Sequence, residues 1–216
     1  MRRSVGLRLA PLLLATACGS TDPSPTPSPS VSPTATATPV ACTGTPSAYA
    51  RAVVSSWIPA CSLARNIYND PRAALGPPDA AGSGPESYSG FVSLGFGGQV
   101  TLDLGGCLQD RPGADLRVFQ AVSSEPVTVY VSTSPDGPFA LVEALKECGR
   151  PYQGIQGYCE FDMATGGQTQ ARYVRVEDGE LFPCPGGTRT EGADLDAVQA
   201  LGVATSSAEP SDPGRR

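Results

Sequence analysis

Acidic residues crowd one short stretch near the C-terminal end of the chain. They are Glu177, Asp178, Glu180, Glu191, Asp194 and Asp196, and they surround a single cysteine. Carboxylate oxygens are the ligands that calcium prefers, and two facing carboxylates can also cleave a glycosidic bond. A third interpretation is a solvated turn whose aspartates accept hydrogen bonds from the backbone. The residues alone leave all three interpretations open.

Catalysis is the least favoured of the three. The chain contains no histidine, so mechanisms that rely on a serine–histidine or cysteine–histidine pair are excluded. No recognisable nucleophile motif accompanies the acids. We therefore expect the protein not to be an enzyme.

Seven cysteines indicate an exported, disulfide-stabilised domain. Cys18 ends an export-type signal, and six others remain: Cys42, Cys61, Cys107, Cys148, Cys159 and Cys184. An even count in an exported chain is typical of a disulfide framework, and the absence of histidine and of Cys-x-x-Cys pairs argues against zinc. Of the possible connectivities we predict Cys42–Cys61, Cys107–Cys184 and Cys148–Cys159.

The N-terminus has the pattern of an export signal. Three arginines precede a short apolar run that is too short to span a bilayer. Leu14-Ala15-Thr16-Ala17-Cys18 resembles a bacterial lipobox, which predicts cleavage after residue 17 and a lipid on the Cys18 thiol. An ordinary secretory signal with cleavage nearby is the alternative. We expect localisation to the bacterial cell envelope, at a membrane surface.

The segment that follows has the composition of an extended stalk. Residues 19–40 hold six prolines and ten serines or threonines, a composition that favours extended polyproline II and cannot build a core. We therefore predict a signal peptide over 1–17, a lipidated cysteine and disordered linker over 18–41, a folded domain over 42–204 and a disordered tail over 205–216.

The charge of the mature chain excludes one class of partner. Removing residues 1–17 takes away three arginines and no acid, which leaves 12 basic against 21 acidic residues, a net charge of −9. Nucleic acid binding needs a basic surface. Nucleic acid is therefore not an expected partner.

The domain shows the periodicity of an all-β protein. Short β-branched or aromatic runs at 90–104, 115–121, 126–134, 139–145, 171–178 and 195–202 are bounded by Gly, Pro, Asn or Asp. Asp136-Gly137 is a hairpin signal between two of these runs. Residues 46–57 fit either a helix face or a strand, and we favour the strand. Many short strands with such turns predict a β-sandwich or jelly roll.

Several stretches in this order resemble the galactose-binding-like jelly rolls. VYVSTSPDGPFALV (129–142) followed by ARYVRVED (171–178) is similar to the core of discoidin or coagulation factor 5/8 type C domains. ALGPPD (74–79), FVSLGFGGQVTLDL (91–104), PGADLRVFQ (112–120) and GADLDAVQAL (192–201) resemble a bacterial cell-surface branch of the same fold. The resemblance covers about residues 46–202 and implies a jelly-roll β-sandwich.

The resemblance also implies two kinds of site. Members of this fold often hold a structural calcium, for which we name Asp79, Asp110, Asp115, Asp194 and Asp196. Sugar-binding members use aromatics and arginines on loops, for which we name Arg150, Tyr152, Gln153 and Tyr158 in a loop over residues 146–160. The expected function is non-catalytic binding of a glycan or another envelope component. The alternative is a structural or protein-partner module whose acidic loops hold a stabilising calcium.

Overall fold

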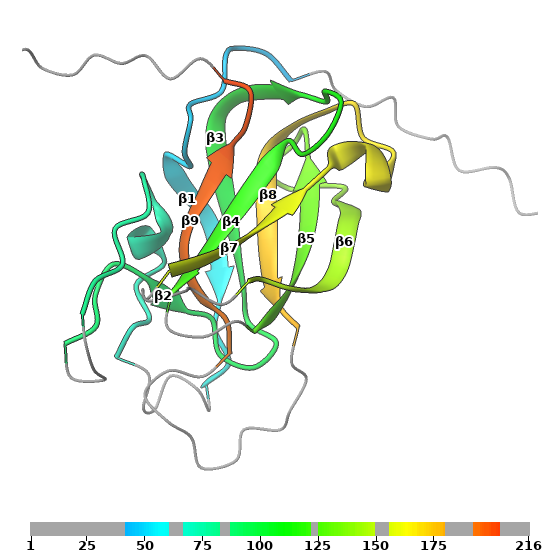
Figure 1. The fold of residues 1–216 in the computed structure, drawn as a ribbon. Helices are drawn as coiled ribbons and strands as arrows, with labels where there is room; N and C mark the ends of the chain where they lie inside the picture. Colours follow the sequence, from blue (N-terminus) through cyan, green and yellow to red (C-terminus); the bar gives the residue numbers. More distant parts are fainter. Residues whose placement is uncertain are drawn as a thin grey trace, which may run out of the picture. The chain divides into compact units, whose positions relative to one another are not determined.

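The regular structure of the described residues is mostly β-strand, with two short 3-10 helices (Figure 1). The structure, a computed structural model, describes residues 42–60, 67–82, 87–121, 125–149, 156–179 and 192–203. These residues all lie within Thr38–Arg216, the second of the two units into which the chain divides. The predicted signal peptide, Cys18, the stalk and the tail over 205–216 lie outside the described residues. No helix within the described ranges has the length and apolarity needed to cross a lipid bilayer.

One antiparallel sheet has five strands in the order β1-β3-β8-β5-β6. The strands are β1 (Ala52–Trp57), β3 (Gln99–Gln109), β8 (Gln170–Asp178), β5 (Pro126–Ser132) and β6 (Ala140–Glu147). The strand interpretation of residues 46–57 is therefore confirmed over its second half. The hairpin predicted at Asp136-Gly137 joins β5 to β6, which pair antiparallel, and Gly137 has the positive φ of 87° that such a turn favours.

The second antiparallel sheet has four strands in the order β2-β9-β4-β7. They are β2 (Val92–Ser93), β9 (Asp194–Ala200), β4 (Leu116–Ala121) and β7 (Gln156–Phe161). Short 3-10 helices, η1 (Pro71–Ala74) and η2 (Met163–Gly166), interrupt the connections. The all-β prediction is confirmed, and the two sheets form a β-sandwich (Figure 1).

Alternating side chains from both sheets fill the space between them. On β8, Val174 and Val176 point into the core while Arg175 and Glu177 stay partly exposed, as the period of two requires. On β4, Leu116 and Val118 enter the same core, and Phe161 on β7 is fully buried there. Burying each such side chain contributes about 1.5–3 kcal/mol. This core fixes the direction in which every intervening side chain points.

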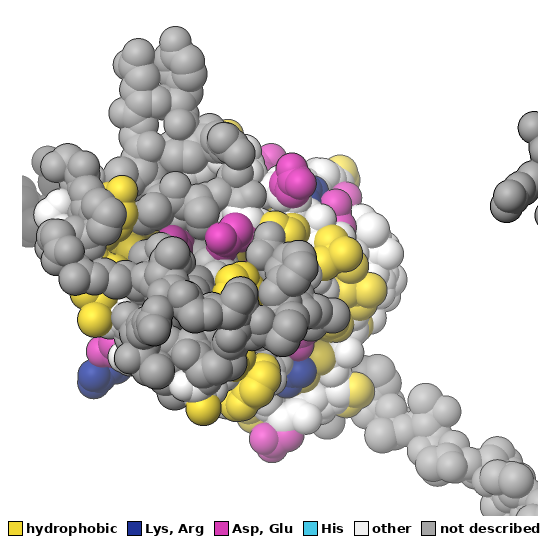
Figure 2. Space-filling model, turned by 90° about the horizontal axis from the view of Figure 1, so that it is seen from below, with side chains coloured by type: hydrophobic (Ala, Val, Ile, Leu, Met, Phe, Trp, Pro, Cys, Tyr) yellow, Lys and Arg dark blue, Asp and Glu magenta, His cyan; other side chains and the backbone are white. Residues whose placement is uncertain are grey.

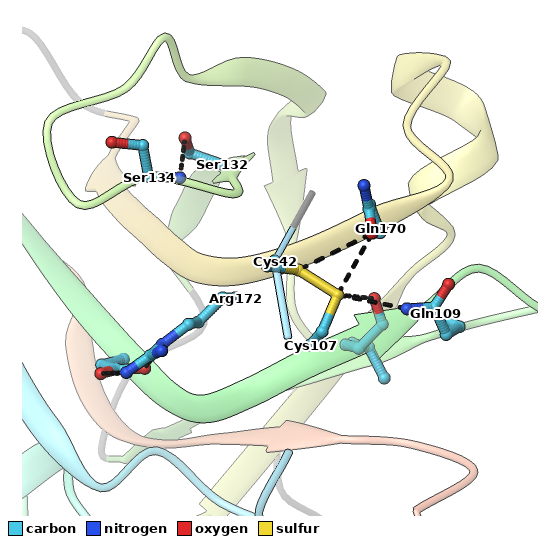
Figure 3. The surroundings of a disulfide bond; sticks show 9 residues. Cys42, Cys107, Gln109, Ser132, Ser134, Gln170 and Arg172 are labelled. Atoms are coloured by element: carbon cyan, nitrogen blue, oxygen red, sulfur yellow. Dashed lines mark hydrogen bonds and ion pairs between the residues drawn. A yellow bond between two sulfur atoms is a disulfide. The ribbon is translucent and has the colours of Figure 1, made fainter. Parts of the chain in front are cut away.

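Two of the three predicted disulfides are wrong. Cys42 is bonded to Cys107, with Cα atoms 5.3 Å apart (Figure 3). The Cys107 amide donates to the Gly44 carbonyl at 2.8 Å, so the chain before β1 runs beside the end of β3 and brings the two cysteines together. This pairing excludes both Cys42–Cys61 and Cys107–Cys184. Cys61 and Cys184 themselves lie outside the described residues.

The third predicted disulfide, Cys148–Cys159, is confirmed, and its Cα atoms lie 4.6 Å apart. Cys148 directly follows β6, whereas Cys159 lies on β7. β6 and β7 are edge strands of different sheets. This bridge therefore closes one open side of the sandwich covalently.

Candidate functional site

The five aspartates predicted to bind calcium do not form one group. Asp115 precedes β4, and Asp194 begins β9. These strands pair antiparallel with Leu116 opposite Ala200 and Gln120 opposite Leu195, so Asp115 and Asp194 lie at opposite ends of the sheet. A strand of this length spans about 20 Å. The Cys107–Cys184 bridge that was expected to join their loops is not formed.

A smaller acidic group does assemble at one end of the sandwich. Carboxylate oxygens of Asp110, Asp115 and Asp162 all lie within 4.8 Å of one another, the one such group of three among the described residues. Asp110 follows β3, Asp115 precedes β4, and Asp162 follows β7. Two of the three were predicted from the sequence. Asp162 was missed because the strand that places it was read as a loop.

Each of these carboxylates meets a different set of donors. Asp115 is 2% exposed and accepts from the amides of Arg111 and Met163, both at 3.0 Å. Asp162 caps η2 by accepting from the Ala164 amide at 2.9 Å. Asp110 Oδ1 is buried and has no hydrogen-bond partner among the described residues. The group therefore offers one carboxylate oxygen that nothing in the described chain satisfies.

Electrostatics at this group favour a positive ion. Burial raises the pKa of Asp115, and the nearby charges of Asp110 and Asp162 raise it further, against the amides of Met163 and Arg111, which lower it. A divalent cation would remove this repulsion. Calcium takes six to eight oxygens, so backbone carbonyls or water would have to complete the shell around three aspartates. The donor set fits a hard cation and contains no soft ligand.

Two aspartates of the acidic stretch near the C-terminal end, Asp178 and Asp196, accept hydrogen bonds from backbone amides of other segments. Asp178 accepts from the amides of Gly97 and Ala193, both at 2.8 Å, and so ties two connections together. Asp196 is 1% exposed and accepts from the Asp79 amide at 3.0 Å. Asp178 and Asp196 are both buried on strands, so the backbone hydrogen bonds of the third interpretation are observed, but the solvated turn is not. Glu180 and Glu191 lie outside the described residues.

Asp194 stands apart as a buried carboxyl group. It is 1% exposed and lies opposite Ser93 in the β2–β9 pair. Burial raises its pKa to about 8, the charges of Glu125 and Asp178 add to the rise, and a hydrogen bond with Ser93 opposes it. Its Oδ1 has no hydrogen-bond partner within the described part of the chain. A carboxyl in this setting is stable as the neutral acid.

The predicted ligand loop is only partly described. Arg150, Tyr152 and Gln153 lie outside the described residues. Tyr158 does not lie on a loop, because residues 156–161 form β7. The sequence signal for this strand is the alternation of outward Tyr158 and Glu160 with inward Cys159 and Phe161, which covers four residues and is too short to stand out.

Tyr158 belongs to a group of side chains on the outer face of the four-stranded sheet. We call this group the β4–β7 platform, and its members are Arg117, Phe119, Tyr158, Glu160 and Gln199. They come from three adjacent strands. In one row across the sheet Arg117 lies between Gln199 and Glu160, and in the next row Phe119 lies between Ala197 and Tyr158. Neighbouring positions in such rows are within side-chain contact.

The platform combines aromatic surface with paired charges. The Arg117 guanidinium lies 4.4 Å from the centre of the Tyr158 ring, and the Phe119 and Tyr158 rings lie 5.9 Å apart. Arg117 Nε donates to Glu160 Oε1 at 3.1 Å. Tyr158 remains 50% exposed. An apolar ring beside hydrogen-bond donors and acceptors is the pattern that polyhydroxylated ligands require.

Basic side chains are few on the face drawn in Figure 2. Among the described residues on this face, acidic side chains lie between hydrophobic ones. The exposed Arg72 is itself ion-paired with Asp70 at 2.9 Å. The surface in view therefore carries no basic patch among the described residues.

The sequence matches no family model, and a search of curated proteins finds no relative.

Proposed function

We propose that this chain is a lipid-anchored protein of the bacterial envelope whose β-sandwich binds carbohydrate on the β4–β7 platform, without catalysis. The observation that carries the proposal is Tyr158, a half-exposed ring held in place by Arg117 and bordered by Phe119. A rigid strand, rather than a loop, positions this ring. Pre-organised aromatic surface binds at low entropic cost.

The order of the strands supports a jelly roll of the galactose-binding-like type. From β3 onward the chain crosses repeatedly from one sheet to the other, with β4, β7 and β9 in the four-stranded sheet and β3, β5, β6 and β8 in the five-stranded one. Jelly rolls are built by such crossings between two facing sheets. The fold alone does not select a ligand, so the ligand is inferred from the platform.

Anchoring at the membrane surface is inferred from the N-terminal residues. The lipobox-like sequence ends at Cys18, and the proline-rich stalk would hold the domain away from the bilayer by about 70 Å as a polyproline II helix. Disulfides are typical of exported proteins, and Cys42–Cys107 and Cys148–Cys159 agree with this location. Metabolic labelling with a fatty-acid analogue, lost in Cys18→Ala, tests the anchor.

Binding is tested by sedimentation of the mature domain with isolated cell-wall material and with insoluble polysaccharides. We expect Tyr158→Ala and Phe119→Ala to reduce the bound fraction. Trp57→Ala is the matched control, because Trp57 is an aromatic of similar exposure, 55%, on β1 of the other sheet. Equal losses in Trp57→Ala and Tyr158→Ala would contradict the proposal.

The acidic group supports a second candidate function, a structural module stabilised by calcium. The three carboxylates within 4.8 Å and the open Asp110 oxygen favour it. The two candidate functions can be distinguished by stability, because a structural ion raises the free energy of unfolding whether or not carbohydrate binds.

A further inference from the structure

The charges on the β4–β7 platform cancel within the platform itself. Arg117 is its only cationic member, and its guanidinium is ion-paired with Glu160. Both side chains are partly exposed, 29% for Arg117 and 41% for Glu160. The platform therefore presents a donor beside an acceptor at its surface, with no net charge.

This balance disfavours anionic ligands. Arginine recognises carboxylate or phosphate through its N–H fork, and here Glu160 already accepts from the Nε of that fork. The mature chain carries a net charge of −9 by the residue count given above. Its overall field repels polyanions as well.

The remaining features fit a neutral sugar ring. The C–H face of a pyranose is apolar and matches the exposed ring of Tyr158, while its edge carries hydroxyls that both donate and accept. The Arg117 guanidinium lies over one face of the Tyr158 ring, so a pyranose would have to stack on the opposite face. The pair that Arg117 forms with Glu160 supplies one donor and one acceptor next to that ring. Phe119 extends the apolar surface along the same row.

We propose that the ligand of the β4–β7 platform is an uncharged polysaccharide, recognised by stacking of a pyranose on Tyr158 and by hydrogen bonds to the Arg117–Glu160 pair. This inference rests on the proposed carbohydrate-binding function and names its substrate class. It identifies Arg117, Phe119 and Glu160 as ligand-contacting residues alongside Tyr158.

The test compares neutral with acidic probes by isothermal titration calorimetry. The probes are cellohexaose, chitohexaose and a polygalacturonate of similar length. The mature domain is expected to bind at least one neutral probe and to bind polygalacturonate at least about tenfold more weakly, a difference of about 1.4 kcal/mol. Two neutral probes separate recognition of the ring from recognition of an N-acetyl group.

Glu160→Gln provides the decisive variant. It leaves Arg117 without a compensating charge, so binding of polygalacturonate should rise while binding of the neutral probe falls. Asp70→Asn is the matched control, since it also releases an arginine, Arg72, from an ion pair and keeps a capping side chain at η1. It should change neither affinity.

The outcomes separate this inference from the proposed function. Preferential binding of polygalacturonate that is lost in Tyr158→Ala would overturn the neutral-ligand inference and leave carbohydrate binding at the platform standing. Binding of neutral probes that survives Tyr158→Ala, or no binding of any polysaccharide, would overturn both. Unchanged probe preference in Glu160→Gln would show that the Arg117–Glu160 pair does not set specificity.

Discussion

Cys148 and Cys159 join the edge strands of two different sheets, with Cα atoms 4.6 Å apart. β7, which carries Cys159, also carries Tyr158 and Glu160 of the platform. The binding surface is thus on the strand that the disulfide ties to the rest of the sandwich. The second described disulfide, Cys42–Cys107, holds the chain before β1 against the end of β3 instead.

Removal of Cys42–Cys107 should destabilise the domain more than removal of Cys148–Cys159. In the chain-entropy account the cost follows the length of the closed loop, about 3 kcal/mol for Cys148–Cys159 and about 4 kcal/mol for Cys42–Cys107, because the sequence separations are 11 and 65. Double alanine variants at each pair, unfolded in urea, measure both costs. Equal costs, or none, would contradict the pairing or the entropic account.

Asp194 should make stability fall as the pH rises. Its pKa is raised to about 8 by burial and by Glu125 and Asp178, so the folded state keeps a proton that the unfolded chain loses near pH 4. The stabilisation is complete below that value and is lost as pH rises towards 8, at up to about 1.4 kcal/mol per unit. Asp194→Asn should flatten the slope over this range.

The check is the free energy of unfolding measured in urea at several pH values from 4 to 8. Asp136→Asn is the control, since Asp136 lies exposed in the β5–β6 turn. Its slope should match that of the unaltered protein. A parallel slope in Asp194→Asn would show that Asp194 is not the responsible group.

Asp103 should have the opposite effect, because its contribution to the free energy of unfolding should be lost as the pH falls. Arg172 donates to it twice, from Nε at 2.9 Å and from Nη2 at 2.8 Å, and this pairing lowers the pKa of Asp103. The pair stabilises the fold above the unfolded pKa, and its contribution is lost as pH falls through the lowered folded value. Arg172→Ala should cost about 1 kcal/mol at neutral pH.

Acid unfolding distinguishes this ion pair from general packing. The stability difference between Arg172→Ala and the unaltered protein should shrink towards zero once Asp103 is protonated. A difference that persists undiminished at pH 2 would mean that the arginine stem, rather than its charge, is what stabilises β8.

Calcium should stabilise the domain through Asp110, Asp115 and Asp162. An ion that binds only the folded state adds about 2.7 kcal/mol at a hundredfold excess over its Kd, so the Tm should rise with added calcium. Asp162→Asn should weaken this rise. Asp79→Asn should not, because Asp79 is not a member of this group of three aspartates and its amide donates to Asp196. Equal responses in the two variants would argue against the site.

The sequence predicted the sheets better than it predicted the sites. Alternation is strong in segments such as 126–134 and 171–178, because both strands lie in the middle of a sheet and bury one face. β7 was not predicted because it is a short edge strand in which cysteine and glycine weaken the alternation. As a result, Tyr158 was predicted to lie on a loop and Asp162 was not predicted as a candidate ligand.

The disulfides show a different limit. Cys148 and Cys159 are close in sequence, and a local pairing was the natural prediction. Cys42 and Cys107 meet only because the segment around Gly44 runs beside β3, a long-range arrangement that spacing cannot reveal. The same holds for the metal candidates, since strand register decides that Asp115 and Asp194 lie at opposite ends of β4 and β9.

Central to this account is the claim that a fixed tyrosine on an edge strand, rather than a loop, binds carbohydrate. The most direct measurement is the affinity of the mature domain for a neutral hexasaccharide, compared between Tyr158→Ala and Trp57→Ala. We expect Tyr158→Ala to weaken binding by about tenfold or more, as loss of a central aromatic anchor does, and Trp57→Ala to leave it unchanged. Unaltered affinity in Tyr158→Ala would contradict the account.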